Sequence, residues 1–352
     1  MNKDLLKYFS LNMKNVESEI KKVIPLKVSE EWLKMFFNSS SDLDISALQK
    51  EYSEPVWDLL NRGGKRWRPM LLLLACESLK GNKNLAMKFT PLPELIHNGT
   101  LIADDIEDNA SLRRGKKTLH LSHGVDTSIN ASNTLYFISL ELLFNNANSL
   151  SEQKINKIYN LYAKQMIAVS FGQALDIRWH KESFIPSKEQ YLKMVSLKTG
   201  ALSRFAAELG AIIANASDEQ QKALGDFAES LGTAFQIQDD ILNINSSKYW
   251  GKDLAEDISE GKKTLIIIKA LEELNKDKKK ELLDILSKQT KEKKQLKRAV
   301  EIIKETKAIS FAEQTAHDVV RKSWESVDSV VSESNSKKLL FEFLQFVVTR
   351  KI

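Results

Sequence analysis

Four carboxylates lie within five residues of one short segment, LIADDIEDNASLRRG, which covers residues 101–115. On a helix, Asp104 and Asp108 would stand one turn apart on the same face, with Asp105 to one side. Like charges at this spacing repel each other and destabilise an isolated helix. If this motif stood alone in the sequence, a solvated acidic helix end would be the commoner explanation for it. A cation between the carboxylates would remove the repulsion, and Mg²⁺ prefers such oxygen ligands beside substrate phosphates.

A second acidic cluster changes the balance between these two explanations. The segment FQIQDDILNI, residues 235–244, again places paired acids, Asp239 and Asp240, inside an apolar helical pattern, with Asn243 one turn after Asp239. Carboxylates flanked by isoleucines need partners, because charge beside apolar surface is costly. Two such clusters can face each other across a helical bundle and share metal ions.

Basic residues accompany both clusters. Helix N-termini and Lys or Arg side chains both favour phosphate oxygens, and the GGKRWRP segment places three bases at a glycine-opened helix start. The bases therefore predict two adjoining polyanion sites, one bridged by metal and one held by cations alone. The bases are Lys65, Arg66, Arg68, Arg113, Arg114, Lys198 in KTG, Lys252, Lys262 and Lys263.

The elements that must position these residues are predicted to be helices. Glycine (13) and proline (6) are sparse in 352 residues, which favours long helices. Apolar residues recur at three- and four-residue spacing along nearly the whole chain, and several segments are apolar all round, as in the interior of a bundle. Alternating strand-like patterns are scarce. We therefore expect an all-α fold.

The chain is predicted to form one domain over residues 1–352, with peripheral helices in 1–45 and C-terminal helices in 271–352. The lysine-rich stretch 275–300 should be an exposed helical hairpin, and the net charge of +5 reflects solvated lysines rather than a nucleic-acid partner. The longest apolar runs, such as Pro69–Cys76, are too short for a transmembrane segment. With one cysteine and no visible secretory signal, we expect a cytoplasmic protein.

Taken together and in this order, the motifs resemble those of the trans-isoprenyl diphosphate synthases, head-to-tail prenyltransferases of all-α fold. The resemblance covers roughly Val56 to Ala270, and HNGTLIADDIEDNASLRRG is most similar to geranylgeranyl diphosphate synthases of the eukaryotic type. Asn243 is consistent with them, whereas Ala103 and Lys117 stand where many relatives carry His and Pro. The resemblance implies an isoprenoid synthase fold of about ten or more helices around a central cavity, and a homodimer.

The resemblance also implies a role for each motif residue. The substrates would be isopentenyl diphosphate and an allylic diphosphate, with three Mg²⁺ ions. Metal would be held by Asp104, Asp105, Asp108, Asp239 and Asp240, the paired Asp105 and Asp240 as ligands or as supports of the ligands. Isopentenyl diphosphate would be held by Lys65, Arg68, His97 and Arg114. The allylic diphosphate would contact Arg113, Lys198, Thr199, Gln236, Lys252 and Lys262.

Product length is set in this family by what blocks the growing tail. Thr100 and Gly99 are the fourth and fifth residues before Asp104, where bulky aromatics stop growth at farnesyl in relatives. Small residues leave this space open. The floor would then be formed by Ile96, one turn further down, and by residues of a neighbouring helix, namely Tyr136 and Phe137. Geranylgeranyl diphosphate is the expected product, with a chain of twenty-five or more carbons, or farnesyl, as the alternative.

Three other functions compete with this prediction. A terpene cyclase shares the fold and the first motif, but it needs no isopentenyl site and so leaves GGKRWRP and Arg114 unexplained. A noncatalytic partner subunit usually loses motif acids, which this chain keeps. A lysine-rich helical scaffold for membrane or nucleic acid would give no reason for acids inside apolar helices.

Overall fold

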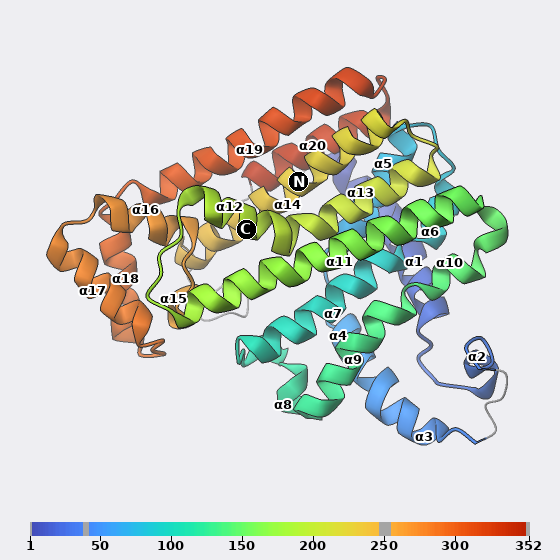
Figure 1. The fold of residues 1–352 in the computed structure, drawn as a ribbon, viewed down its shortest axis with the longest axis horizontal. Coiled ribbons are helices and arrows are strands. Elements are labelled where there is room, and N and C mark those ends of the chain that lie inside the picture. Colours follow the sequence, from blue (N-terminus) through green and yellow to red (C-terminus); the bar gives the residue numbers. More distant parts are fainter. Residues whose placement is uncertain (1, 38–41, 246–254, 350–352) are drawn as a thin grey trace.

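The structure is a computed structural model that describes residues 2–37, 42–245 and 255–349. Nearly every described segment is helical, and long helices lie side by side along the molecule (Figure 1). The all-α class predicted from the sequence is therefore confirmed. Within the described residues, no helix combines the length and apolar character that a bilayer crossing requires.

The elements follow one another with short connections. The first half contains α1 (Lys3–Val23), α2 (Glu30–Leu33), α3 (Ile45–Leu48), the π-helix η1 (Gln49–Ser53), α4 (Glu54–Asn61), α5 (Trp67–Ser78), α6 (Lys83–Lys88), α7 (Pro91–Glu107), β1 (Leu112–Arg113), β2 (Lys116–Lys117), α8 (Leu119–His123), α9 (Val125–Ile138), α10 (Glu141–Asn145) and the 3₁₀-helix η2 (Ala147–Ser149). The second half contains α11 (Glu152–Lys181), α12 (Lys188–Val195), the π-helix η3 (Ser196–Gly200), α13 (Ala201–Ile213), α14 (Asp218–Asn245), α15 (Glu256–Ser259), α16 (Leu265–Glu273), α17 (Lys276–Ser287), α18 (Lys293–Lys304), α19 (Ala308–Val330) and α20 (Asn335–Thr349).

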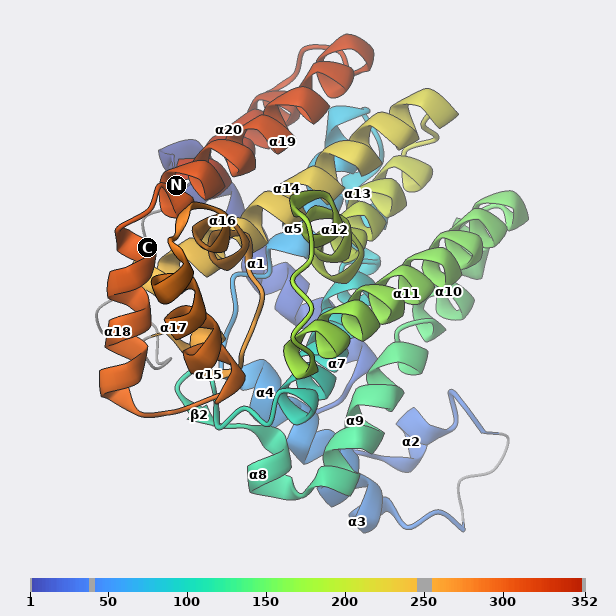
Figure 2. The ribbon, with the colours of Figure 1, turned by 60° about the vertical axis from the view of Figure 1, so that its left-hand side comes forward.

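The centre of the bundle is built from helices that are apolar on most sides. In α5, every residue from Met70 to Cys76 is completely buried, because α13 and α20 pack against it. α13 in turn packs against α11 and α14, the two longest helices (Figure 2). A helix that is apolar all round needs neighbours on every side, which explains why α5 occupies the interior.

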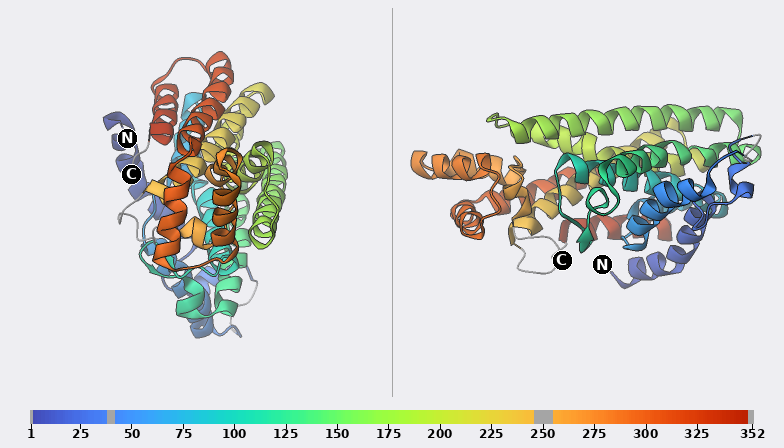
Figure 3. Two further views of the ribbon diagram at one scale, coloured as in Figure 1. Left: turned by 90° about the vertical axis from the view of Figure 1, so that its left-hand side faces the viewer. Right: turned by 90° about the horizontal axis from the view of Figure 1, so that it is seen from below.

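Peripheral helices cover this centre at both ends. α1 buries Leu5, Phe9, Val16 and Ile20 against α5, α6, α7 and α20. The α17–α18 pair lies at the opposite end of the molecule from α2 and α3 (Figure 3, right). It forms the helical hairpin that the lysine-rich sequence predicts, with leucines and isoleucines packed inward and most lysines exposed.

Two local features prepare the site. β1 and β2 form a two-residue antiparallel hairpin that the helical pattern did not predict. Its turn contains Arg114 and Gly115, whose φ angles of 53° and 77° are positive. A positive φ is uncommon for residues other than glycine and occurs mostly in turns. Before α5, Gly63 and Gly64 have φ of 81° and 145°, which side-chain-bearing residues rarely adopt. Both turns bring backbone and basic side chains to one end of the central helices.

Candidate functional site

A single large cavity contains both acidic clusters. Its volume is about 970 Å³, and its walls come from the loop before α5 and from α7, α11, η3, α14 and α15. Asp104 and Asp108 line it from α7, and Asp239 and Asp240 line it from α14. The sequence prediction that the two clusters face one shared space therefore agrees with the structure.

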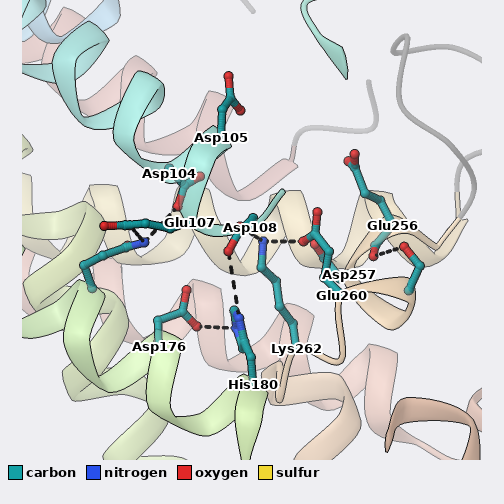
Figure 4. A network of polar contacts seen from close by, with 12 residues as sticks. Asp104, Asp105, Glu107, Asp108, Asp176, His180, Glu256, Asp257, Glu260 and Lys262 are labelled. Atoms are coloured by element: carbon teal, nitrogen blue, oxygen red, sulfur yellow. Dashed lines mark hydrogen bonds and ion pairs between the residues drawn. The ribbon is translucent and has the colours of Figure 1, made fainter. Parts of the chain in front are cut away.

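The first cluster is tied to lysines from other elements. Lys198 Nζ donates to Asp104 Oδ1 at 2.9 Å. Lys262 Nζ donates to Asp108 Oδ2 at 2.9 Å, and both of these residues are labelled in Figure 4. Burial alone would raise the pKa of Asp104, but the charges of Lys198, Lys262 and Arg113 hold it well below its usual range. Asp104 is therefore an anion whose neighbours are already cationic.

Asp105 has a different environment from its neighbours in the sequence. It points away from Asp104 and Asp108 (Figure 4), is buried, and accepts a hydrogen bond from Arg113 Nε at 2.8 Å. It is not among the residues that line the cavity, although Arg113 is. Asp105 thus holds Arg113 in place rather than presenting its oxygens to the cavity.

The second cluster is held by neutral donors. Tyr191 Oη donates to Asp240 Oδ2 at 2.5 Å, and Gln236 Nε2 donates to Asp240 Oδ1 at 3.0 Å. Burial and the nearby charge of Asp257 raise the pKa of Asp240 to about 8. Asn243 lines the cavity too, but its side-chain oxygen accepts from the backbone N–H of Asp257 at 3.3 Å, which ties α14 to α15.

α11 supplies site residues that the sequence analysis missed. Asp176 Oδ2 accepts from Lys198 Nζ at 2.5 Å, Gln173 Nε2 donates to Asp104 Oδ1 at 3.2 Å, and His180 Nε2 lies 2.8 Å from Asp176 Oδ1 (Figure 4). These three residues stand at i, i+3 and i+7 within GQALDIRWH, the spacing of one helix face. This spacing could have predicted, from the sequence alone, a row of polar side chains on one face of the helix.

The segment around α15 adds further acids to the cavity lining. Asp257 and Glu260 line the cavity, and Glu260 Oε2 lies 2.6 Å from Lys262 Nζ. Burial raises the pKa of Glu260 to about 7. Each of the two lysines therefore lies between two acids. Lys198 contacts Asp104 and Asp176, and Lys262 contacts Asp108 and Glu260. The sequence motifs did not indicate Asp176 or Glu260.

The predicted isopentenyl diphosphate residues also gather in the cavity, which is lined by Lys65, Arg68, His97 and Arg114. Arg68 is buried, its burial lowers its pKa to about 10, and its Nε has no hydrogen-bond partner among the described residues. Burial and the charges of Arg68 and Arg114 lower the pKa of His97 far below its usual value, so His97 is neutral. A buried guanidinium with an unused donor suits an anionic ligand.

The remaining predicted contacts lie near Lys198. Thr199 Oγ1 donates to Gln236 Oε1 at 3.3 Å, and both residues line the cavity. Lys198 and Thr199 belong to η3, a π-helical turn of the kind that often marks functional sites. Gly172 of α11 lets η3 approach, because a Cβ at this position would lie 2.3 Å from Lys198 N. Lys252 lies outside the described residues.

The predicted chain-length residues divide into two groups. Thr100 and Tyr136 line the cavity, and Ser132 Oγ donates to Tyr136 Oη at 3.3 Å. Gly99 instead faces α9, since a Cβ there would lie 2.7 Å from the Tyr136 ring, and Ile96 is buried away from the cavity. The Phe137 side chain is 70% exposed. The expectation that Gly99 opens the space for the tail and that Phe137 forms its floor therefore needs correction.

The fold and the site define a helical enzyme that binds diphosphates, and residues 49–303 match the family model described as polyprenyl synthetase. The chain belongs to this family of prenyltransferases. It is 39% identical over 247 residues to a short chain isoprenyl diphosphate synthase of Methanocaldococcus jannaschii, covering 70% of this chain and 74% of the relative. It is 34% identical over 301 residues to a geranylgeranyl diphosphate synthase of Sulfolobus acidocaldarius, covering 85% and 90%.

Solved structures agree with this assignment. A geranylgeranyl pyrophosphate synthetase from Pyrococcus horikoshii superposes with a TM-score of 0.85 at 30% identity, covering 99% of both chains. These relatives are archaeal, so the expected affinity to the eukaryotic type is not borne out. The expectation rested on one motif of nineteen residues, which is too short a segment to decide the lineage.

Proposed function

We propose that the protein condenses isopentenyl diphosphate with allylic diphosphates in a Mg²⁺-dependent reaction and releases geranylgeranyl diphosphate. The observation that carries this proposal is the arrangement of one cavity with carboxylates on two walls and a separate group of cations around the buried Arg68. The names of the archaeal relatives support the substrate class and the product. A terpene cyclase has no use for the group around Arg68, His97 and Arg114.

The donor set fits Mg²⁺. The cavity walls offer carboxylate oxygens from Asp104, Asp108 and Asp239, the hard ligands that this ion prefers. Within the described residues no three acids, histidines or cysteines converge into one metal shell, and Mg²⁺ held by one or two carboxylates would take its other ligands from substrate phosphate oxygens and water. When bound, Mg²⁺ supplies positive charge that stabilises the leaving diphosphate, and we propose three ions.

The protein's own groups position the two substrates. Lys198 and Lys262 sit between acids at the wall where the allylic diphosphate would lie, so each can turn an N–H toward its oxygens. Arg68, Arg114 and Lys65 hold the second diphosphate apart from the first. Charge that develops during ionisation thus meets preorganised cations. The double bond of isopentenyl diphosphate attacks the allylic cation, and the released diphosphate accepts the proton that is lost.

The apolar part of the cavity limits the product. Its lining includes Thr100 and Leu101 of α7, which precede Asp104 by about one turn, together with Tyr136 of α9 and Val169 of α11. These side chains exclude water, which would otherwise convert the carbocation to an alcohol. Thr100 leaves room where a larger side chain would stop growth, so a twenty-carbon chain is the proposed product and a longer one is the second candidate.

We also propose a homodimer. The three most exposed phenylalanine side chains among the described residues are Phe137, Phe144 and Phe171, at 70%, 66% and 63%. They lie on α9, α10 and α11, which are neighbours, since Tyr162 of α11 donates to the Tyr136 carbonyl and the rings of Phe144 and Tyr159 are 6.1 Å apart. Exposed apolar surface of this kind marks an interaction site. The buried Cys76 agrees with a reducing compartment, and we place the enzyme in the cytoplasm.

The proposal is tested by incubating the purified protein with Mg²⁺, labelled isopentenyl diphosphate and, separately, dimethylallyl, geranyl and farnesyl diphosphates. We expect label in a twenty-carbon alcohol after dephosphorylation, and no product when Mg²⁺ is chelated. If none of the three primers gave a labelled product, the proposed activity would be ruled out. Consumption of the allylic diphosphate without isopentenyl diphosphate would indicate a cyclase instead.

A further inference from the structure

Asp240 makes two hydrogen bonds that fix its orientation, and neither comes from a charged group. Its Oδ2 accepts from Tyr191 Oη at 2.5 Å, and its Oδ1 accepts from Gln236 Nε2 at 3.0 Å. The carboxylate is 4% exposed, so these contacts decide its direction. Both donors are uncharged.

The corresponding acid of the first cluster is treated differently. Asp105 is paired with the guanidinium of Arg113, which brings a full positive charge. Tyr191 and Gln236 bring none to Asp240. The direction of the Asp240 carboxyl group is therefore set by two neutral hydrogen bonds rather than by an ion pair such as that of Asp105.

Tyr191 is well suited to hold a carboxylate still. Ser187 and Gln190 form a capping box at the start of α12, directly before Tyr191, and this fixes the first turn of the helix. The ring is 2% exposed and lines the cavity wall, so packed neighbours restrict its movement. Neither KTG nor the two acidic motifs include this residue.

We propose that Tyr191 is a positioning residue for metal binding: its hydroxyl donates to Asp240 and so fixes the direction in which Asp239 and Asp240 face the Mg²⁺–diphosphate complex. This inference rests on the proposed function. Groups that hydrogen-bond to metal-binding carboxylates typically contribute about ten- to hundredfold to metal affinity.

The test is a direct measurement of metal binding that needs no turnover. Mn²⁺ binding to the full chain is followed by electron paramagnetic resonance in the presence of inorganic diphosphate, for wild type and Tyr191→Phe. We expect the dissociation constant of Mn²⁺ to rise about ten- to hundredfold in the variant. The Mg²⁺ concentration for half-maximal rate should rise by the same factor, with the rate at saturating Mg²⁺ changed only a few-fold. An unchanged Mn²⁺ affinity would overturn the proposal.

Tyr8→Phe is the matched control. Tyr8 also donates its hydroxyl to a carboxylate, that of Glu77, but between α1 and α5 and outside the cavity lining. The same chemical change there should leave Mn²⁺ affinity as in wild type. A loss equal to that of Tyr191→Phe would mean that the effect is a general one of removing a tyrosine hydroxyl, and would overturn the specific role.

A double variant keeps the test decisive if Tyr191→Phe folds poorly. Asp240→Asn removes the buried carboxyl group that Tyr191 supports, so the Tyr191→Phe/Asp240→Asn chain does not contain a buried acid that has lost its tyrosine donor. If Tyr191 acts only through Asp240, the double variant should bind Mn²⁺ as Asp240→Asn does; a further loss would contradict the proposal. Because these readouts do not depend on product formation, a wild type that binds Mn²⁺ but transfers no prenyl group would refute the proposed function separately.

Discussion

At the scale of single residues, each substrate site is defined by a different kind of cation. Lys198 and Lys262 are bound between pairs of acids, Asp104 with Asp176 and Asp108 with Glu260. Arg68 instead lies buried near His97 and Arg114, with an unused donor. In the proposed function, the lysines would belong to a site where metal and diphosphate share acids, and the arginines to a site where an anion meets cations directly.

This difference predicts separable effects on the two substrates. Lys198→Ala should mainly raise the Michaelis constant for the allylic primer, and Arg68→Ala mainly that for isopentenyl diphosphate. Each change removes a charge-assisted contact of about 1.5–3 kcal/mol, or roughly ten- to hundredfold in affinity. Both Michaelis constants are measured for both variants. Equal effects on both substrates from either change would show that the assignment of the sites is wrong.

The orientation of α7 decides which small residue controls product length. Thr100 is one turn before Asp104 and lines the cavity, whereas Gly99 packs against Tyr136. Thr100→Phe should therefore place a ring beneath the metal site and shift the main product toward farnesyl diphosphate. Product chains are analysed after dephosphorylation, with Thr100→Ser as the control that should keep the wild-type product. A folded, active Thr100→Phe enzyme with the wild-type distribution would place the limit elsewhere, most directly at Tyr136.

The sequence predicted most of this site at residue resolution, but not the direction of each side chain. The spacing of Asp104, Asp108 and Asp239 identifies one face of each helix, and the structure places all three in the cavity. Consecutive residues on a helix point about 100° apart, so apolar spacing alone could not say whether Gly99 or Thr100 faces the tail. The roles of Tyr191 and Asp176 depend on contacts between distant segments, which no local pattern contains.

At the scale of elements, the position of Lys198 depends on how closely α11 approaches η3. Gly172 is the point of approach, since an added Cβ would lie 2.3 Å from Lys198 N and 2.7 Å from its Cα. These are backbone atoms, so no side-chain rotation can relieve the contact. The helices themselves were predictable from apolar periodicity, but the π-helical turn at KTG was not, because its hydrogen bonding reflects this packing.

Gly172→Ala should therefore disturb both stability and catalysis. Overpacking of a tight contact costs about 1–3 kcal/mol, and a shift of about 1 Å in a catalytic group can lower activity roughly a hundredfold. We expect a lower melting temperature and a fall of at least about tenfold in kcat/KM. Lys164→Ala, an exposed substitution two turns earlier on α11, should change neither quantity. Wild-type kinetics in Gly172→Ala would show that η3 can move without loss of function.

At the scale of the whole molecule, two surfaces among the described residues differ in character. The α17–α18 hairpin presents mostly lysines and no strongly exposed large apolar side chain among its described residues, which suits contact with water. α9, α10 and α11 instead expose Phe137, Phe144 and Phe171. Composition predicted the first surface. The second surface could not be predicted from the sequence, because these phenylalanines fit the same apolar periodicity as core residues.

The exposed phenylalanines predict that the protein associates through this face. In sedimentation-velocity experiments we expect wild type to behave as a dimer of 40.0 kDa chains. Phe144→Asp/Phe171→Asp should shift it to monomer, because two charges would have to be buried without partners. Leu11→Asp is the matched control: Leu11 is 67% exposed on α1, which is not one of these three helices, and its replacement should leave the dimer intact. A monomeric wild type, or a double variant that still dimerises, would show that these aromatic side chains have another partner.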